Sequence, residues 1–223
     1  MNINLISTLL SIPAVLIALT VHEYAHGYTA YRLGDPTARS LGRLTLNPLK
    51  HLDPIGAIFM LLFHFGWARP VPINPRYFKN PRRGMALTAL AGPAANFILS
   101  LLGAFLYVGA NYLLWRLAPV LPASRLLARF LDFTLIFLFY FHYINLTLGL
   151  FNCIPLPPLD GSRFFLLLLP KRAYFAVMRY ERYIAIGLMI LLFVGAFTGI
   201  LSLATEWISG GMIGLFELFF GLL

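Results

Sequence analysis

Charged residues are scarce in this chain, and their scarcity limits what kind of protein it can be. Asp, Glu, Lys and Arg make up 11% of its 223 residues, hydrophobic residues make up 60%, and the mean hydropathy is +0.80. About a quarter of the residues of a soluble domain are charged. The composition therefore excludes a water-soluble enzyme and a disordered tail. It predicts an integral membrane protein whose residues 1–223 form a single membrane-embedded domain.

Cysteine and acidic residues are few as well. The single cysteine, Cys153, permits no disulfide within the chain. Eight Asp and Glu against 17 Lys and Arg give a net charge of +9. In a membrane protein such an excess usually records topology and contact with anionic lipid headgroups, and no aromatic–basic RNA-binding motif accompanies it. We therefore expect the lipid bilayer, and no nucleic acid, as a partner.

Long charge-poor segments predict four membrane-spanning helices. Each is long enough to hold the ~20 residues that a spanning helix needs. The segments are residues 1–31, with Glu23 as the only charge, 84–115, 133–159 and 183–205. Residues 54–68 are apolar over a shorter stretch and predict a re-entrant or interfacial segment. The tail, 207–223, contains Glu217 and several glycines and is interpreted as an interfacial helix.

The distribution of basic residues predicts the orientation. If residues 54–68 do not cross, segments 32–83 and 163–182 lie on one side with fourteen Lys and Arg, and three Arg lie on the other. By the positive-inside rule the first side is cytoplasmic. Residues 42–47 and 68–74 have strand-like composition, which adds a small β element on the cytoplasmic face. The predicted fold class is therefore all-α, with four transmembrane helices, one re-entrant segment and this small β element.

The strongest chemical signal is the run His22-Glu23-Tyr24-Ala25-His26 near the cytoplasmic end of the first span. Residues four apart lie on one face of a helix, so both imidazoles can reach one metal ion. Glu23 is placed to accept a proton from a water that the metal activates. Polar residues inside an apolar span cost insertion free energy and are usually functional. The alternative is that these side chains only form hydrogen bonds to neighbouring helices.

A catalytic zinc ion normally has three protein ligands and one open position, so a third ligand is needed. Asp160 is favoured, because it follows three prolines directly after the third span, at the membrane level of the two histidines. Alternatively, Asp160 is a turn residue or the N-cap of a helix. For Asp53, which precedes Pro54, the N-cap is the better interpretation. The remaining candidates are His51, His64 and His142.

Small and polar residues form stripes on the second and third spans. On the second span they recur every four residues, which predicts a face for close helix contact: Thr88, Gly92, Asn96, Ser100 and Ala104. Asn145, Gly149 and Asn152 form a similar stripe on the third span. For Asn96, interhelical hydrogen bonding and substrate binding both remain open. We expect Asn152 to hold the substrate backbone or to stabilise the oxyanion.

Together these residues resemble the site-2 protease family of intramembrane zinc metalloproteases (peptidase family M50), in its short bacterial type. Three blocks carry the resemblance, which spans most of the chain: His22-Glu23-Tyr24-Ala25-His26, Gly92-Pro93-Ala94-Ala95-Asn96 and Asn152-Cys153-Ile154-Pro155 through Asp160-Gly161. The stretch 46–56 is also similar to the short bacterial members. The resemblance implies one Zn²⁺ per chain held by His22, His26 and Asp160, Glu23 as the general base, and Asn152 near the active site.

The expected reaction is hydrolysis of peptide bonds in or near transmembrane segments of membrane protein substrates. The expected location is the cell membrane of a bacterium, with the active site toward the cytoplasm. No PDZ-like or CBS-like domain fits in the length, so control falls to a regulatory membrane partner, a homo-oligomer or prior trimming of the substrate. The alternatives are a transporter or channel that uses the same polar residues, a lipid-modifying metalloenzyme, and a catalytically silent scaffold.

Overall fold

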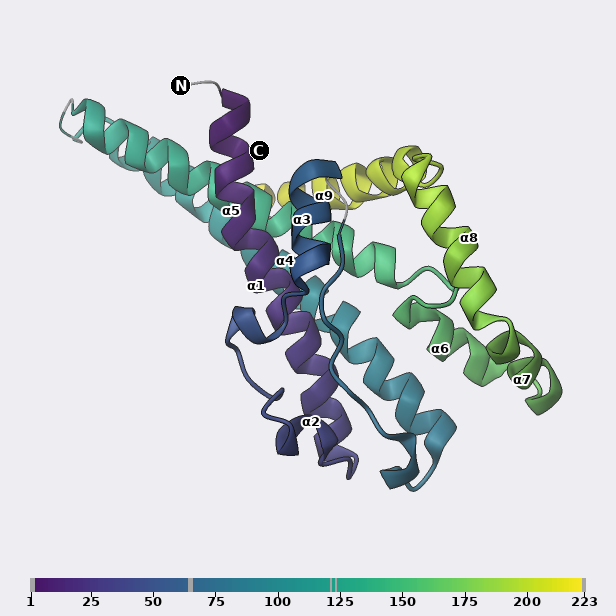
Figure 1. Ribbon diagram of the computed structural model, residues 1–223. Helices are drawn as coiled ribbons and strands as arrows, with labels where there is room; N and C mark the ends of the chain where they lie inside the picture. The colour runs from purple at the N-terminus through teal and green to yellow at the C-terminus, as the bar shows by residue number, and fades with distance from the viewer. Residues whose placement is uncertain (1–2, 64–65, 121, 123, 222–223) are drawn as a thin grey trace.

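The computed structural model describes residues 3–63, 66–120, 122 and 124–221, and the described chain is almost entirely helical (Figure 1). Three long helices pack most extensively against one another: α1 (Ile3–Arg32), α4 (Pro81–Leu117) and α5 (Arg125–Asn152). A fourth long helix, α9 (Thr198–Phe220), closes the chain. The shorter elements are α2 (Thr37–Ser40), η1 (Pro48–Lys50), α3 (Pro54–Phe63), η2 (Pro75–Tyr77), α6 (Asp160–Leu168), α7 (Lys171–Arg179) and α8 (Glu181–Phe193).

The core lies where α1, α4 and α5 pack against one another. The predicted stripe on α4 faces this core, since Thr88, Asn96, Ser100 and Ala104 have no exposed surface. Gly103 is needed for the same packing, because a β-carbon there would lie 2.9 Å from the ring of Phe141 and 3.0 Å from the backbone of His142. Small side chains on α4 thus allow the polar groups of α1 and α5 to meet inside an apolar bundle.

In the described part of the chain four helices are long and apolar enough to cross a membrane, as predicted, but the last one is displaced along the sequence. The predicted span 183–205 is interrupted after Phe193, where Gly195 adopts φ +75° and the chain turns before Thr198. A residue with positive φ cannot continue an α-helix. The span is therefore α9, which includes most of the tail that the sequence assigned to an interfacial helix. It packs along α4 and α5, with Ser209 bonded to His142.

The predicted re-entrant segment returns to its starting point. Its helix, α3, has only ten residues, about 15 Å of length. Leu52 and Ala68 form an antiparallel bridge, and the N–H of Arg69 donates to the carbonyl of His51. Because its two ends are paired, they lie side by side, which is the arrangement that a re-entrant segment requires.

The predicted β element is wrong for the part of the chain that the structure describes, in which that one bridge is the only β pairing. Residues 42–47 form turns, and residues 68–74 run extended without a partner strand. Pro70 and Pro72 have no N–H to donate. The N–H of Val71, which lies between them, bonds to a side chain instead.

Candidate active site

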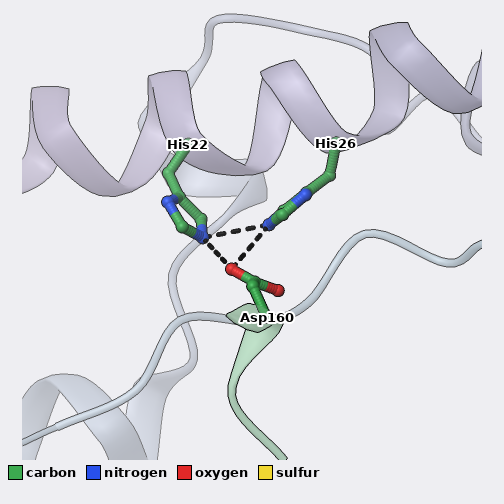
Figure 2. A group of neighbouring side chains, drawn as sticks. All are labelled: His22, His26 and Asp160. Carbon is green, nitrogen blue, oxygen red and sulfur yellow. Dashed lines mark hydrogen bonds and ion pairs between the residues drawn. The ribbon is translucent and has the colours of Figure 1, made fainter. Parts of the chain in front are cut away.

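Three side chains from distant parts of the sequence converge on one point (Figure 2). His22 and His26 lie one turn apart on α1, and Asp160 is the first residue of α6. The Oδ2 atom of Asp160 lies 3.0 Å from Nε2 of His22 and 3.2 Å from Nε2 of His26. The two Nε2 atoms are themselves 3.0 Å apart. Both histidines are buried, and Asp160 is partly exposed.

The other nitrogen of each imidazole is held by α4. Nδ1 of His26 lies 2.7 Å from the backbone carbonyl oxygen of Thr88, which can only accept a hydrogen bond. Nδ1 of His22 lies 2.6 Å from Oδ1 of Asn96. The Asn96 amide nitrogen donates to the carbonyl of Ala18 and to Asn145, so its oxygen faces His22. Both imidazoles therefore carry their proton on Nδ1 when neutral, and both Nε2 atoms present a lone pair.

This arrangement suits a metal ion. Two nitrogen lone pairs and a carboxylate oxygen lie together, and Oδ2 of Asp160 is buried without a hydrogen-bond donor among the described residues. Such atoms repel one another unless a cation lies between them. Ligand atoms about 2 Å from a tetrahedral zinc ion lie about 3.3 Å apart, which is close to the separations found here. The donor set of two imidazoles and one carboxylate is one that zinc accepts in catalytic sites.

Gly92 of α4 leaves room for the two imidazoles. A β-carbon at this position would lie 2.5 Å from Nε2 of His26 and 2.6 Å from Cε1 of His22. Only glycine lets α4 approach the two imidazoles this closely. The sequence singled out Gly92 as part of a packing stripe, and the structure shows what it packs against.

The chain between α5 and α6 places Asp160 next to the two histidines. α5 ends at Asn152, and Pro155, Pro157 and Pro158 cannot continue a helix, so the chain folds back before α6 begins. A β-carbon on Gly161 would lie 2.4 Å from the carbonyl oxygen of Cys153. The glycine after Asp160 thus lets the start of α6 press against the end of α5. Burial, and in addition the Asp160 carboxylate, raises the pKa of the Cys153 thiol above its ordinary value.

Glu23 is held by an extended segment from the other side. The backbone N–H of Val71 donates to its Oε2 over 2.7 Å, and both residues are buried. Arg43 fixes the same segment, because its Nη2 donates to the carbonyl of Arg69 over 2.7 Å and approaches that of Pro70 at 3.3 Å. Burial and the neighbouring Arg69 lower the pKa of Arg43, whereas the Glu23 carboxylate raises it. The sequence placed Val71 and Arg43 only in strand-like stretches and did not indicate these roles, because both residues act through contacts with distant residues.

The two asparagines named from the sequence have different surroundings. Asn96, expected to bind substrate or to bond between helices, is fully buried and bonded to His22, Ala18 and Asn145. It is thus an interhelical hydrogen-bond partner of a histidine. Asn152 is partly exposed in the last turn of α5, where one N–H of its amide donates to the carbonyl of Leu148 over 3.0 Å.

The other candidates for a third ligand are engaged elsewhere. His51 bonds through Nε2 to the carbonyl of Thr45, and Asp53 accepts from the N–H of Gly56 as the N-cap of α3. His142 lies between Ser100 and Ser209, where it joins α5 to α4 and α9. His64 lies outside the described residues. Among the described residues, Asp160 alone joins the two histidines.

Comparisons with known proteins point to one family. A model of Peptidase family M50 matches residues 119–195, which include Asp160. The protein named "Putative zinc metalloprotease YwhC" of Bacillus subtilis (strain 168) is 43% identical over 169 residues, 76% of this chain and 73% of that protein. "Putative zinc metalloprotease Rip2" is 30% identical in both Mycolicibacterium smegmatis and Mycobacterium tuberculosis, over 69% and 66% of this chain. The chain spans about half the length of these mycobacterial relatives. No solved structure gives a significant match.

Proposed function

The chain belongs to peptidase family M50, the site-2 protease family, and on that premise we propose that it is a zinc metalloprotease that cleaves membrane protein substrates in or near their transmembrane segments. The single observation that carries the proposal is the convergence of His22, His26 and Asp160 on one point within a bundle of spanning helices. In this proposal these three residues bind one zinc ion per chain. Residues 1–223 act as one metalloprotease domain.

The chemistry divides between the metal and Glu23. A zinc ion held by His22, His26 and Asp160 would supply Lewis acidity for the scissile carbonyl and would make water more acidic. Glu23 is the general base: its carboxylate accepts a proton from the attacking water and returns it to the leaving amine as the C–N bond breaks. The Val71 N–H holds one carboxylate oxygen, Oε2, and leaves Oε1 for this proton.

Asn152 is the proposed donor to the oxyanion. A β-carbon on Gly161 would lie 2.9 Å from the backbone oxygen of Asn152, so the end of α5 lies close to the metal ligand Asp160. One N–H of its amide bonds to Leu148, and the second remains for the substrate. Asn96 takes a different role, in which it orients His22 and fixes its tautomer.

A helical substrate must unwind before its carbonyls can be attacked, and the extended segment 69–73 is the proposed place for the unwound chain to pair. Much of its backbone is already engaged. The N–H of Arg69 bonds to His51, the carbonyls of Arg69 and Pro70 accept from Arg43, and the N–H of Val71 bonds to Glu23. The proposed edge is therefore limited to the part from the Val71 carbonyl to Ile73.

The expected location is a bacterial cell membrane with the site toward the cytoplasm, on the side of the basic segments 32–83 and 163–182. Partners are the lipid bilayer and a transmembrane substrate. A regulatory membrane protein or a second copy of the chain is the proposed means of control.

Metal content and cleavage together test the proposal. We expect about one zinc ion per detergent-purified chain, clearly less in Asp160→Ala, and a normal amount in Glu23→Gln. With model transmembrane substrates, Glu23→Gln should lose activity by a factor of about 10²–10⁴. If the unaltered chain bound no zinc even when zinc is supplied, the proposal that it is an enzyme would be refuted. A transport activity that survives Glu23→Gln would favour a transporter.

A further inference from the structure

Arg82 joins the beginning of α4 to the end of α6. It is the second residue of α4, and its Nη2 atom donates to three carbonyl oxygens at the end of α6. The distances are 3.1 Å to Leu166, 3.1 Å to Leu167 and 2.7 Å to Leu169. The last carbonyls of a helix have no partner within it, and a cation there also interacts favourably with the helix dipole. The guanidinium is held from another side by the ring of Tyr174, 4.9 Å from its centroid.

The two helices joined by Arg82 carry different parts of the metal site. α6 is nine residues long and begins with the ligand Asp160. α4 carries Thr88 and Asn96, whose oxygens orient the two histidine ligands. Figure 1 shows α6 beside the first half of α4, and the two helices are in extensive contact. A bond between them therefore fixes the carboxylate relative to the imidazoles.

The remaining attachments of α6 make this bond important. Its first turn is located by Gly161 against the carbonyl of Cys153 and by an ion pair between Arg163 and Glu181 at the start of α8, and before that turn lies irregular chain with three prolines. A nine-residue helix is about 13 Å long and tilts as a unit, so a shift of its last turn also displaces its first residue. Arg82 restrains that end.

We propose that Arg82 is a positioning residue for the metal ligand Asp160. It acts by holding the end of α6 on α4, so that the carboxylate stays within reach of Nε2 of His22 and His26. The inference rests on the proposed metal site and adds a determinant of metal affinity that contacts neither metal nor substrate.

Arg83 provides a matched control. It is the next residue on α4, carries the same charge and is exposed, and its backbone N–H bonds to Asn80. Arg83→Gln removes the same charge from the same turn, and among the described residues it removes none of the three hydrogen bonds to the end of α6. Arg82→Gln removes the three bonds, and Arg82→Lys keeps the charge but replaces the planar guanidinium by a single ammonium on a flexible stem.

The experiment titrates metal-free, detergent-purified full-length chain with Co²⁺ and Zn²⁺. The readouts are metal affinity, the visible absorption spectrum of bound Co²⁺, and the shift in melting temperature that the metal produces. We expect Arg82→Gln to weaken metal affinity roughly tenfold or more, with a changed Co²⁺ spectrum, as for other residues outside the ligand set. Arg82→Lys should be intermediate, and Arg83→Gln should match the unaltered chain.

A merely structural role gives a different pattern. It would lower the melting temperature of the metal-free and metal-loaded protein equally and leave the metal-induced shift unchanged. That result, or an unchanged affinity and spectrum in Arg82→Gln, would overturn the inference. If Arg82→Gln does not fold, Arg82→Lys carries the same comparison. Failure of the proposed function is distinct, because the unaltered chain would then bind metal no better than Asp160→Ala.

Discussion

The backbone N–H of Val71 lies 2.7 Å from Oε2 of Glu23 and donates a hydrogen bond to it. The two residues are 48 positions apart, and the contact ties an extended segment near the re-entrant hairpin to the proposed general base. Val71 also packs against α1, since a β-carbon on Gly27 would lie 3.1 Å from Val71 Cγ1. The orientation of Glu23 thus depends on a segment that belongs to no helix.

Replacing Val71 with proline should reduce cleavage while metal content stays normal. The change removes the N–H that fixes Glu23, and a hydrogen bond to a charged group contributes about 1.5–3 kcal/mol, or roughly 10- to 100-fold in rate. Ile73→Pro is the control, two residues along the same segment. Loss of activity in Val71→Pro alone indicates the Glu23 contact, and loss in both supports pairing of substrate with this segment. Full activity in Val71→Pro would show that the bond has no part in catalysis.

Gly92→Ala should abolish metal binding. The added methyl would lie 2.5 Å from Nε2 of His26, within the space of the ligand atoms, and the backbone of a helix cannot give way locally. Gly210→Ala on α9 is the control, because a β-carbon there meets nothing within 4 Å. Zinc content measured after purification decides the matter, and a normal value in Gly92→Ala would contradict the described closeness of α4 to the histidines.

Asn96→Ala should weaken zinc binding by about 10- to 100-fold, the usual effect of removing a partner of a ligating histidine. The change removes the hydrogen bond that fixes the orientation and the tautomer of the His22 ring. Asn111→Ala is matched, since Asn111 is on the same helix and its amide bonds only to the carbonyl of Tyr107 among the contacts of the described chain. Competition with a chromophoric chelator gives both affinities. Equal affinities would mean that Asn96 has no influence on His22.

Ser209→Ala should lower the thermal stability of the protein, because it weakens the attachment of α9, without changing metal content. Ser209 bonds to Nε2 of the fully buried His142, and a buried nitrogen left without its partner costs about 1–3 kcal/mol. Ser202→Ala on the same helix should have almost no effect, because Ser202 is only partly buried and its hydroxyl bonds to the carbonyl of Gly199 within its own turn. Thermal unfolding in detergent compares the two. An equal effect of both changes would argue against His142 as the attachment of α9.

Cysteine labelling should place the start of α4 in the cytoplasm. In a Cys153→Ser background, a cysteine at exposed Lys79 should react with an impermeant reagent only after the cells are opened. A cysteine at exposed Arg125, the first residue of α5 and beyond the other end of α4, should react in intact cells. The reverse pattern would invert the topology and move the proposed active site to the outer side.

The sequence by itself determined what depends on composition and on spacing along one helix. Low charge and long apolar segments established a membrane protein with four spans, and the four-residue spacing placed His22 and His26 on one face of α1 and Thr88, Asn96 and Ser100 on one face of α4. These features follow from helix periodicity and from the cost of burying charge, which act locally. Three of the four spans were located for the same reason.

Only the tertiary structure decided which residues meet. Gly195 ends α8 and moves the fourth span to α9, and a hydropathy pattern does not register a single left-handed residue. Asp160 reaches the histidines while Asp53 caps its own helix, although both are carboxylates beside prolines. The partners of His22, His26 and Glu23 lie 74, 62 and 48 positions away. Such contacts depend on how the helices pack, which the residues of one segment do not specify.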